Sequence, residues 1–306
     1  MYIRKVPAHA FLAAAILCHV GLAAEQETLE LTISCAQEYV IGEPVIILAT
    51  VKNISDTPQD NIVSLEGGWA NMYYLGFDVQ GPKSHRNRLE YCVGFDGRSR
   101  YGDIIVLQPG EVSVGEFTLT SFRAPGRYTV FGRYILHGTV PSGHPLPVVR
   151  SDPIHFDVRA LSEEDRKVLE LMGWKGRSFP QLDGGIFFYT KAGKETLHVD
   201  IIKNHPEATL TKYLRFNLAR FYSREGRNEE ARAALEMLAK PGPTFALTDD
   251  ALLLLAETCI SSDPDRAERA LRRIEAEFPK GNCVKRADKM LKKLKKVKEK
   301  LKKPAK

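Results

Sequence analysis

The hydrophobic period of the chain changes near residue 161, and this change most constrains what the sequence can fold into. Before it, apolar and polar residues alternate in short runs. In LELTISC, this alternation puts Leu29, Leu31, Ile33 and Cys35 on one face. After residue 161, apolar residues recur at steps of three and four, which is typical of amphipathic helices. The sequence therefore predicts a multidomain protein, with a β half followed by an α half.

The β half contains about seven short alternating runs between Thr28 and Val158, most of them bounded by Gly or Pro. Short strands at this spacing predict an antiparallel β-sandwich, in which each sheet buries one face. A small β-barrel is the alternative. The stretch from 58 to 102 is richer in Gly and polar residues, and it predicts one strand and a long loop.

The first helix is predicted to begin after Ser162, whose hydroxyl group can cap it, with Asp165 three positions later. A Gly-rich stretch then interrupts the helical pattern until about residue 194. From Glu195 onward the chain is helical, and Pro206, Pro243 and Pro279 follow one another at intervals of 37 and 36 residues. Two helices in each interval predict a helical solenoid.

One interval resembles a tetratricopeptide repeat in the spacing of its residues, which are Leu218, Ala219, Tyr222, Gly226, Ala231, Leu235 and Pro243. This spacing predicts a tight turn at Gly226 between two helices. The next interval departs from the pattern, because SSDPDR replaces the turn glycine. Together with IGEPVIILATVKNIS, LQPGE, APGRYTVFGRY and RSDPIHFDV, these helices make the chain similar to uncharacterised exported bacterial proteins. That resemblance implies an all-β Ig-like sandwich followed by an all-α tetratricopeptide-like solenoid, and it carries no catalytic residues.

The N-terminus has the pattern of a secretory signal peptide, with Arg4 and Lys5 before the apolar run Phe11–Ala24. That run is too short for a membrane anchor, which needs about 20 apolar residues. The chain is therefore predicted to be exported, to the periplasm or the extracellular space. The predicted organisation is a signal peptide (1–24), an Ig-like domain (25–160), a helix with a Gly-rich linker (161–194), tetratricopeptide-like repeats (195–284) and a Lys-rich amphipathic helix (285–306).

Sequence motifs of enzymes are missing from the chain, which contains no GxSxG, HExxH, Walker or Rossmann pattern. His137 and His144 share a loop but have no third ligand beside them, and no CxxC occurs. Asp249 and Asp250 are interpreted as acidic residues that favour a helix N-terminus. We therefore predict no catalytic residue, cofactor or metal. An enzyme or a proteinase inhibitor built on the sandwich loops is the less favoured alternative.

Four cysteines follow the signal peptide, at positions 35, 92, 259 and 283. A return helix of about 22 Å separates Cys259 from Cys283, so these two are predicted not to pair. Cys35 and Cys92 are the candidate disulfide, because a strand and a long loop can meet.

Binding to a protein or peptide partner is the predicted function, and it follows from the resemblance. In tetratricopeptide proteins the first helices line a concave groove. On this chain that groove would expose Tyr213, Phe216, Arg220 and Arg224, which suit an acidic, partly apolar peptide. The sequence thus favours a non-catalytic exported binding or scaffold protein.

The basic tail supports an alternative function. Residues 285–306 hold 12 Lys or Arg against Asp288 and Glu299, so the tail is strongly basic although the whole chain has a net charge of only +6. Lys292, Lys293, Lys295 and Lys296 would bind an anionic lipid or polymer surface, with the β-sandwich as a second recognition surface. The competing interpretation is a solvated helix that only caps the solenoid. Nucleic acid is not expected, because the tail lacks aromatic residues that stack on bases.

Overall fold

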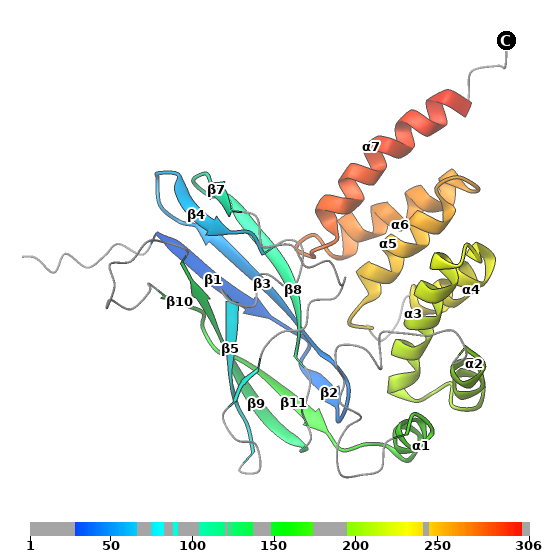
Figure 1. The fold of residues 1–306 in the computed structure, drawn as a ribbon. Helices are drawn as coiled ribbons and strands as arrows, with labels where there is room; N and C mark the ends of the chain where they lie inside the picture. The colour runs from blue at the N-terminus through cyan, green and yellow to red at the C-terminus, as the bar shows by residue number, and fades with distance from the viewer. Residues whose placement is uncertain are drawn as a thin grey trace, which may run out of the picture.

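The computed structural model describes residues 28–65, 75–82, 88–90, 104–119, 122, 124–136, 148–173, 195–240 and 245–301. Eleven strands and then seven helices follow one another along these segments. Figure 1 shows the strands gathered in one part of the molecule and the helices in another, with α7 beside α6.

The strands form three small sheets. Their bounds are β1 Leu29–Ser34, β2 Glu38–Val40, β3 Val45–Asn53, β4 Gln59–Val63, β5 Leu75–Gln80, β6 Arg88–Glu90, β7 Ile104–Leu107, β8 Val112–Leu119, β9 Gly126–Ile135, β10 Val148–Arg150 and β11 Ile154–Arg159. The three-stranded sheet has the order β1-β3-β8, and the two-stranded sheet is β4-β7. The six-stranded sheet has the order β2-β11-β9-β5-β6, with β10 also paired to β9. Within it, β2 and β11 run parallel.

Alternation along β1 is as the sequence predicts: Leu29, Leu31 and Ile33 are buried, and the residues between them are exposed. Successive side chains of a strand point to opposite faces, so one face of β1 contributes to the core. Residues from all three sheets meet in that core, including Phe77 of the six-stranded sheet and Ile62 of the two-stranded sheet. Burying each such side chain contributes about 1.5–3 kcal/mol.

Tyr134 joins two of the sheets through its fully buried hydroxyl group. This oxygen accepts the backbone N–H of Val63 at 2.7 Å and donates to the Val63 carbonyl at 2.8 Å. We expect Tyr134→Phe to lower the free energy of unfolding by about 1–3 kcal/mol, since both backbone groups lose a buried partner. Denaturant unfolding measures the change. Tyr128→Phe is the control, because its hydroxyl group donates to the Ala124 carbonyl within the same segment. A cost no larger than that of the control would contradict the prediction.

The helices are α1 Glu163–Leu171, α2 Glu195–Asn204, α3 Thr209–Arg224, α4 Asn228–Leu238, α5 Thr248–Cys259, α6 Pro264–Glu277 and α7 Val284–Leu301. The predicted cap of α1 is confirmed, because the Asp165 backbone N–H donates to Ser162 Oγ at 3.0 Å. The predicted turn at Gly226 is also confirmed. This glycine lies between α3 and α4 with φ of +73°, a left-handed conformation that glycine adopts without steric cost.

The helices and the sheets share part of one hydrophobic core. Val40 and Ile46, from β2 and β3, belong to the same buried cluster as the residues of α3 and α5. The hydroxyl group of Tyr213 on α3 also donates to Glu43 Oε1 at 2.7 Å. The two parts of the chain therefore pack directly on one another.

The fold class predicted from the sequence is wrong. The chain is a mixed α and β protein. Its described strands are divided among three small sheets, which do not make a clear all-β sandwich. Its seven described helices do not establish a solenoid. Alternation indicates which face of a strand is buried, but it does not indicate which strands pair, and the parallel β2–β11 pair joins segments far apart in the sequence. The repeated spacing reflects the hairpins α3–α4 and α5–α6, whose matched residues are buried.

Several predictions concern residues outside the described segments. These are the signal peptide at 1–24, Cys92, His137, His144, Pro243, most of the Gly-rich linker before Glu195, and residues 302–306 of the basic tail. Among the helices of the described residues, none has the length and apolar character needed to cross a membrane.

Candidate functional site

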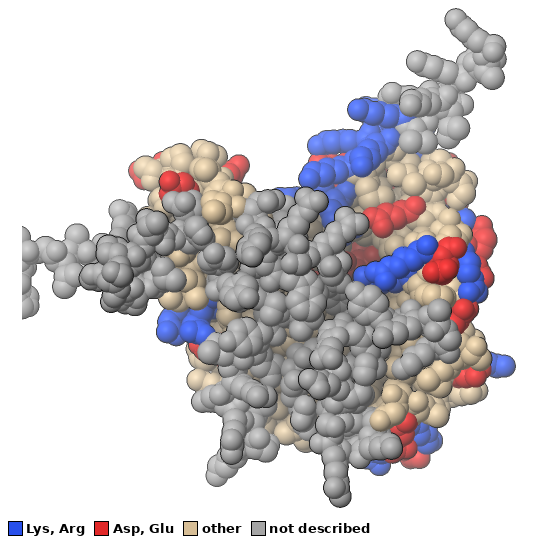
Figure 2. Space-filling model, viewed as in Figure 1, with Lys and Arg blue, Asp and Glu red and all other residues tan. Residues whose placement is uncertain are grey.

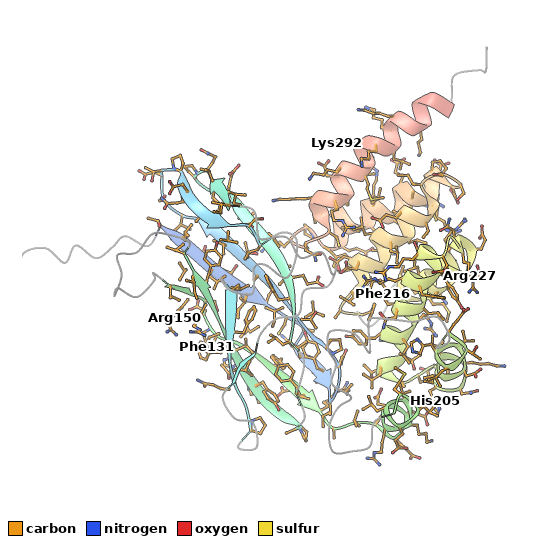
Figure 3. The ribbon with its side chains drawn as sticks, viewed as in Figure 1. Phe131, Arg150, His205, Phe216, Arg227 and Lys292 are labelled. Atoms are coloured by element: carbon orange, nitrogen blue, oxygen red, sulfur yellow. The ribbon has the colours of Figure 1, made fainter. Side chains whose placement is uncertain are left out.

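The predicted partner-binding aromatics lie inside the protein. Tyr213 is 1% exposed and Phe216 is 3% exposed, and the ring of Phe245 packs against both, at centroid distances of 5.0 and 6.0 Å. Figure 3 shows Phe216 among the helices. The prediction that these two side chains line an open groove is therefore corrected, because helical periodicity alone does not show which face a neighbour covers.

The two predicted arginines lie further along α3. The guanidinium group of Arg220 is 6.0 Å from the ring centroid of Phe216, in cation–π geometry. Arg224 is exposed in the last turn of the helix. The four residues thus form no common surface, since the aromatic pair is buried, Arg220 is half-buried and Arg224 is exposed.

The four predicted lysines of α7 are all exposed. Figure 2 shows Lys and Arg side chains gathered along this helix, and Figure 3 places Lys292 on it. Lys292 forms an ion pair with Asp288 at 2.7 Å, one turn earlier. On the opposite side, Ala287 and Leu294 are buried, and Met290 and Leu291 pack partly against the core. The helix therefore has a covered apolar face and an open lysine face.

Cys35 is a free thiol that donates to the Ala36 carbonyl at 3.1 Å, and burial raises its pKa to about 11. Its proposed partner Cys92 lies outside the described residues, so this disulfide stays a prediction. Cys283 lies beside Asp250 near the start of α5, whereas Cys259 ends that helix. The two thiols are thus at opposite ends of α5, as the helix length predicted.

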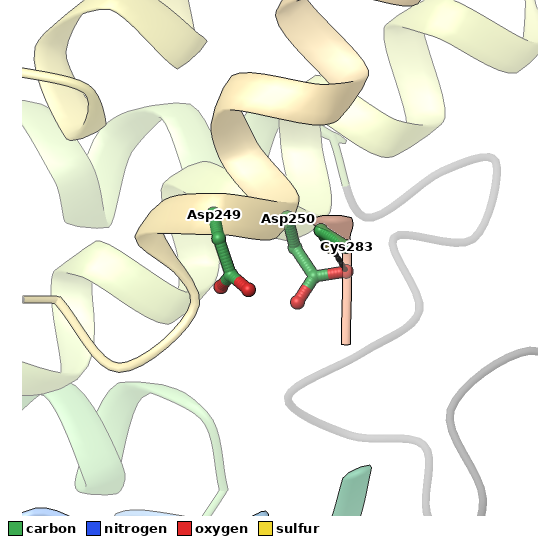
Figure 4. Close-up of side chains that lie close together, drawn as sticks. All are labelled: Asp249, Asp250 and Cys283. Atoms are coloured by element: carbon green, nitrogen blue, oxygen red, sulfur yellow. Dashed lines mark hydrogen bonds between the residues drawn. The ribbon is translucent and has the colours of Figure 1, made fainter. Parts of the chain in front are cut away.

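A cluster that the sequence did not predict lies where α5 and α7 begin. Asp249 and Asp250 are in the first turn of α5, and Cys283 directly precedes α7. Figure 4 shows the three side chains close together, and their possible ligand atoms all lie within 4.8 Å of one another. The Cys283 thiol is 3.6 Å from Asp250 Oδ1 and donates a hydrogen bond to it.

Glu116 on β8 adds a third carboxyl group to the electrostatics of this cluster. Asn282 Nδ2 donates to Glu116 Oε2 at 2.9 Å, which connects β8 to the residues before α7. Burial, and then repulsion from Asp250 and Asp249, raise the pKa of Glu116 well above its usual value. We name Glu116, Asp249, Asp250, Asn282 and Cys283 the junction cluster, because it lies between the sheets and the helices.

Burial is also the main cause of the other perturbed pKa values in the junction cluster. It raises the pKa of Asp250 to about 7, with repulsion from Asp249 as the second cause. Burial also raises the pKa of Asp249. The pKa of the Cys283 thiol is raised as well, by burial and then by the neighbouring carboxylates. Since like charges repel strongly where water is excluded, these groups favour a shared proton or a bound cation.

No motif in the sequence points to the junction cluster. Two adjacent acids at a helix start are common, and Cys283 lies 33 residues further along the chain, without metal-ligand spacing. Only the packing of β8, α5 and the start of α7 brings the groups together.

Comparisons with known proteins give no family for this chain. No protein-family model matches the sequence, and no curated protein matches it. A β-glucosidase from Listeria innocua in complex with gluconolactone is 21% identical over 42% of this chain and 16% of its own, with a TM-score of 0.24. The alkylpurine DNA glycosylase AlkC of Pseudomonas fluorescens is 12% identical over 44% of this chain and 31% of its own, with a TM-score of 0.26.

The CARDB domain of PF1109 from Pyrococcus furiosus is 16% identical over 44% of this chain and 94% of its own, with a TM-score of 0.23. All three similarities are partial, and TM-scores this low carry no argument about fold or function.

Proposed function

We propose that this protein is a non-catalytic binding protein that attaches to an anionic lipid surface through the lysines of α7. The observation that supports the proposal is the open lysine face, formed by exposed Lys292, Lys293, Lys295 and Lys296 on the side of α7 opposite its buried residues. The partner-binding alternative has less support, because both of its aromatic anchors are buried.

The proposed binding is electrostatic. Each lysine near an anionic bilayer contributes about 1 kcal/mol, so four give a useful affinity that salt weakens. The apolar side of α7 is not available for insertion, because Ala287 and Leu294 are buried against the protein. Headgroup charge, and not acyl-chain contact, would therefore determine binding. Export, predicted from the N-terminal residues, would bring α7 to a membrane of the cell envelope.

Neutralising the lysine face tests the proposal. We expect the full chain to co-sediment with phosphatidylcholine vesicles that contain phosphatidylglycerol, and not with phosphatidylcholine alone. Replacing Lys292, Lys293, Lys295 and Lys296 by Gln is expected to weaken vesicle binding by about 100-fold or more, because about 1 kcal/mol is lost per lysine.

The matched control neutralises four exposed basic residues outside α7, namely Lys52, Arg166, Lys203 and Lys240. It removes the same charge, so it should retain most of the binding. Equal binding by the α7 variant and the wild type would overturn the proposal. Retention by an anionic polymer such as polyphosphate, without binding to vesicles, would overturn the lipid assignment in favour of a polymer.

A further inference from the structure

We infer that the junction cluster is a binding site for one divalent transition-metal ion of the zinc type, held by Asp249, Asp250 and Cys283, with Glu116 and Asn282 nearby. This site is distinct from the lysine face of α7, and the inference does not depend on the proposed function.

The geometry brings suitable ligand atoms together. One carboxylate oxygen from each aspartate and the Cys283 sulfur lie within 4.8 Å of one another. Zinc binds carboxylate oxygen at about 2.0–2.2 Å and thiolate sulfur at about 2.3 Å, so one ion between these atoms needs only small side-chain movements. Asp249 is 7% exposed and Cys283 is 1% exposed, whereas Asp250 is partly exposed.

Two oxygen atoms of the junction cluster provide an independent observation. Asp250 Oδ2 and Asn282 Oδ1 are buried and accept no hydrogen bond from any described residue. Buried oxygen atoms are almost always partnered, and leaving one without a partner destabilises the fold. In Figure 4 the carboxyl groups of Asp249 and Asp250 project the same way from the first turn of α5. Both unpartnered oxygen atoms can bind a cation. The Asn282 amide oxygen is an observation separate from the clustering of the acidic residues.

The local charges also favour a cation. Glu116, Asp249 and Asp250 repel one another, as the causes of their raised pKa values show. Arg286 and Arg220 partly offset the charge of Asp250, but Arg286 is also engaged with Glu257 at 3.2 Å. A divalent ion would stabilise all three carboxylates and would remove the proton from the Cys283 thiol.

The ligand types select the metal. Calcium and magnesium take oxygen ligands only, whereas a cysteine among carboxylates suits zinc and related transition metals. The three ligands come from the first turn of α5 and from the residue just before α7, so a bound ion would hold these two helix starts together. Binding to the folded state alone would raise its stability.

Cobalt(II), which takes zinc sites and absorbs light, tests the inference on the full chain after its metals have been removed with EDTA. We expect one Co²⁺ per chain and a near-ultraviolet sulfur-to-cobalt charge-transfer band that Zn²⁺ abolishes. Cys283→Ser should lose the band. Asp250→Asn should weaken Co²⁺ binding by more than about tenfold, since loss of even an outer partner costs 10–100-fold. Cys259→Ser is the control, because this free buried thiol is at the other end of α5.

Three results would overturn the inference: no saturable Co²⁺ binding, a charge-transfer band that persists in Cys283→Ser, or unchanged affinity in Asp250→Asn. Circular dichroism shows whether each variant folds. If Cys283→Ser does not fold, the Zn²⁺-induced rise in melting temperature decides the question. It should occur in the wild type and be much smaller in Asp250→Asn, and an equal rise in both would refute the site.

Discussion

Replacing Phe216 by alanine is expected to lower the free energy of unfolding by about 3–5 kcal/mol, the cost of a large cavity in a packed core. Phe216 is 3% exposed and packs against Phe245, whose ring also contacts Tyr213. These residues belong to the cluster in which α3 and α5 meet. The substitution therefore removes contacts from the centre of the helical part. Guanidinium unfolding, with the slope m compared between variants, measures the loss.

Arg224→Ala is the matched control, since it truncates an exposed residue of the same helix. We expect it to change the free energy of unfolding by less than about 0.5 kcal/mol. A cost below 1 kcal/mol for Phe216→Ala would contradict the buried placement. It would also return Phe216 to the partner-binding role that the sequence suggested.

Local features of this fold can be predicted from the sequence because they depend on nearby residues. The alternation of β1, the Ser162 cap and the turn at Gly226 are each decided within a few positions. The helical spacing also identifies buried residues correctly, as Leu235 and Leu271 show. In each case the period or the capping chemistry carries the information.

The fold class could not be predicted from the same patterns, because it depends on which elements meet. Val40 and Ile46 read as ordinary strand residues, yet they join the helical core. Tyr213 reads as a surface aromatic of a groove, yet its hydroxyl group bonds to Glu43, 170 residues earlier. A repeat resemblance assumes that each helix pair packs only on its neighbours. Here the sheets supply some of those contacts instead.

The junction cluster was missed for the same reason. Asp249 and Asp250 have a sufficient local explanation, because acidic residues favour a helix N-terminus. Their environment changes only when Cys283 and Glu116 are packed beside them. Burial then becomes the main cause of their raised pKa values, and no sequence motif records burial.

The second large effect concerns the charge of Asp250. Without metal, burial raises its pKa from 3.8 to about 7 in the folded protein. Its protonated form is thus favoured by folding. The resulting stability is present below pH 3.8 and is lost as the pH rises through about 7. In EDTA, Asp250→Asn removes the buried charge while keeping the shape. We therefore expect this variant to be more stable than the wild type at pH 8, by about 2–4 kcal/mol.

Denaturant unfolding at pH 5 and pH 8 measures this difference. It should be smaller at pH 5, because the folded wild type then keeps Asp250 protonated and only its unfolded chain ionises this group. Asp200→Asn, which replaces an exposed residue of α2, is the control and should change the free energy of unfolding by less than about 0.5 kcal/mol at either pH. A loss of stability in Asp250→Asn at pH 8 would show that the fold favours the ionised carboxylate. At pH 8, saturating Zn²⁺ should make the wild type more stable than Asp250→Asn. The ion binds the ionised Asp250 carboxylate of the folded protein, and asparagine cannot replace that ligand.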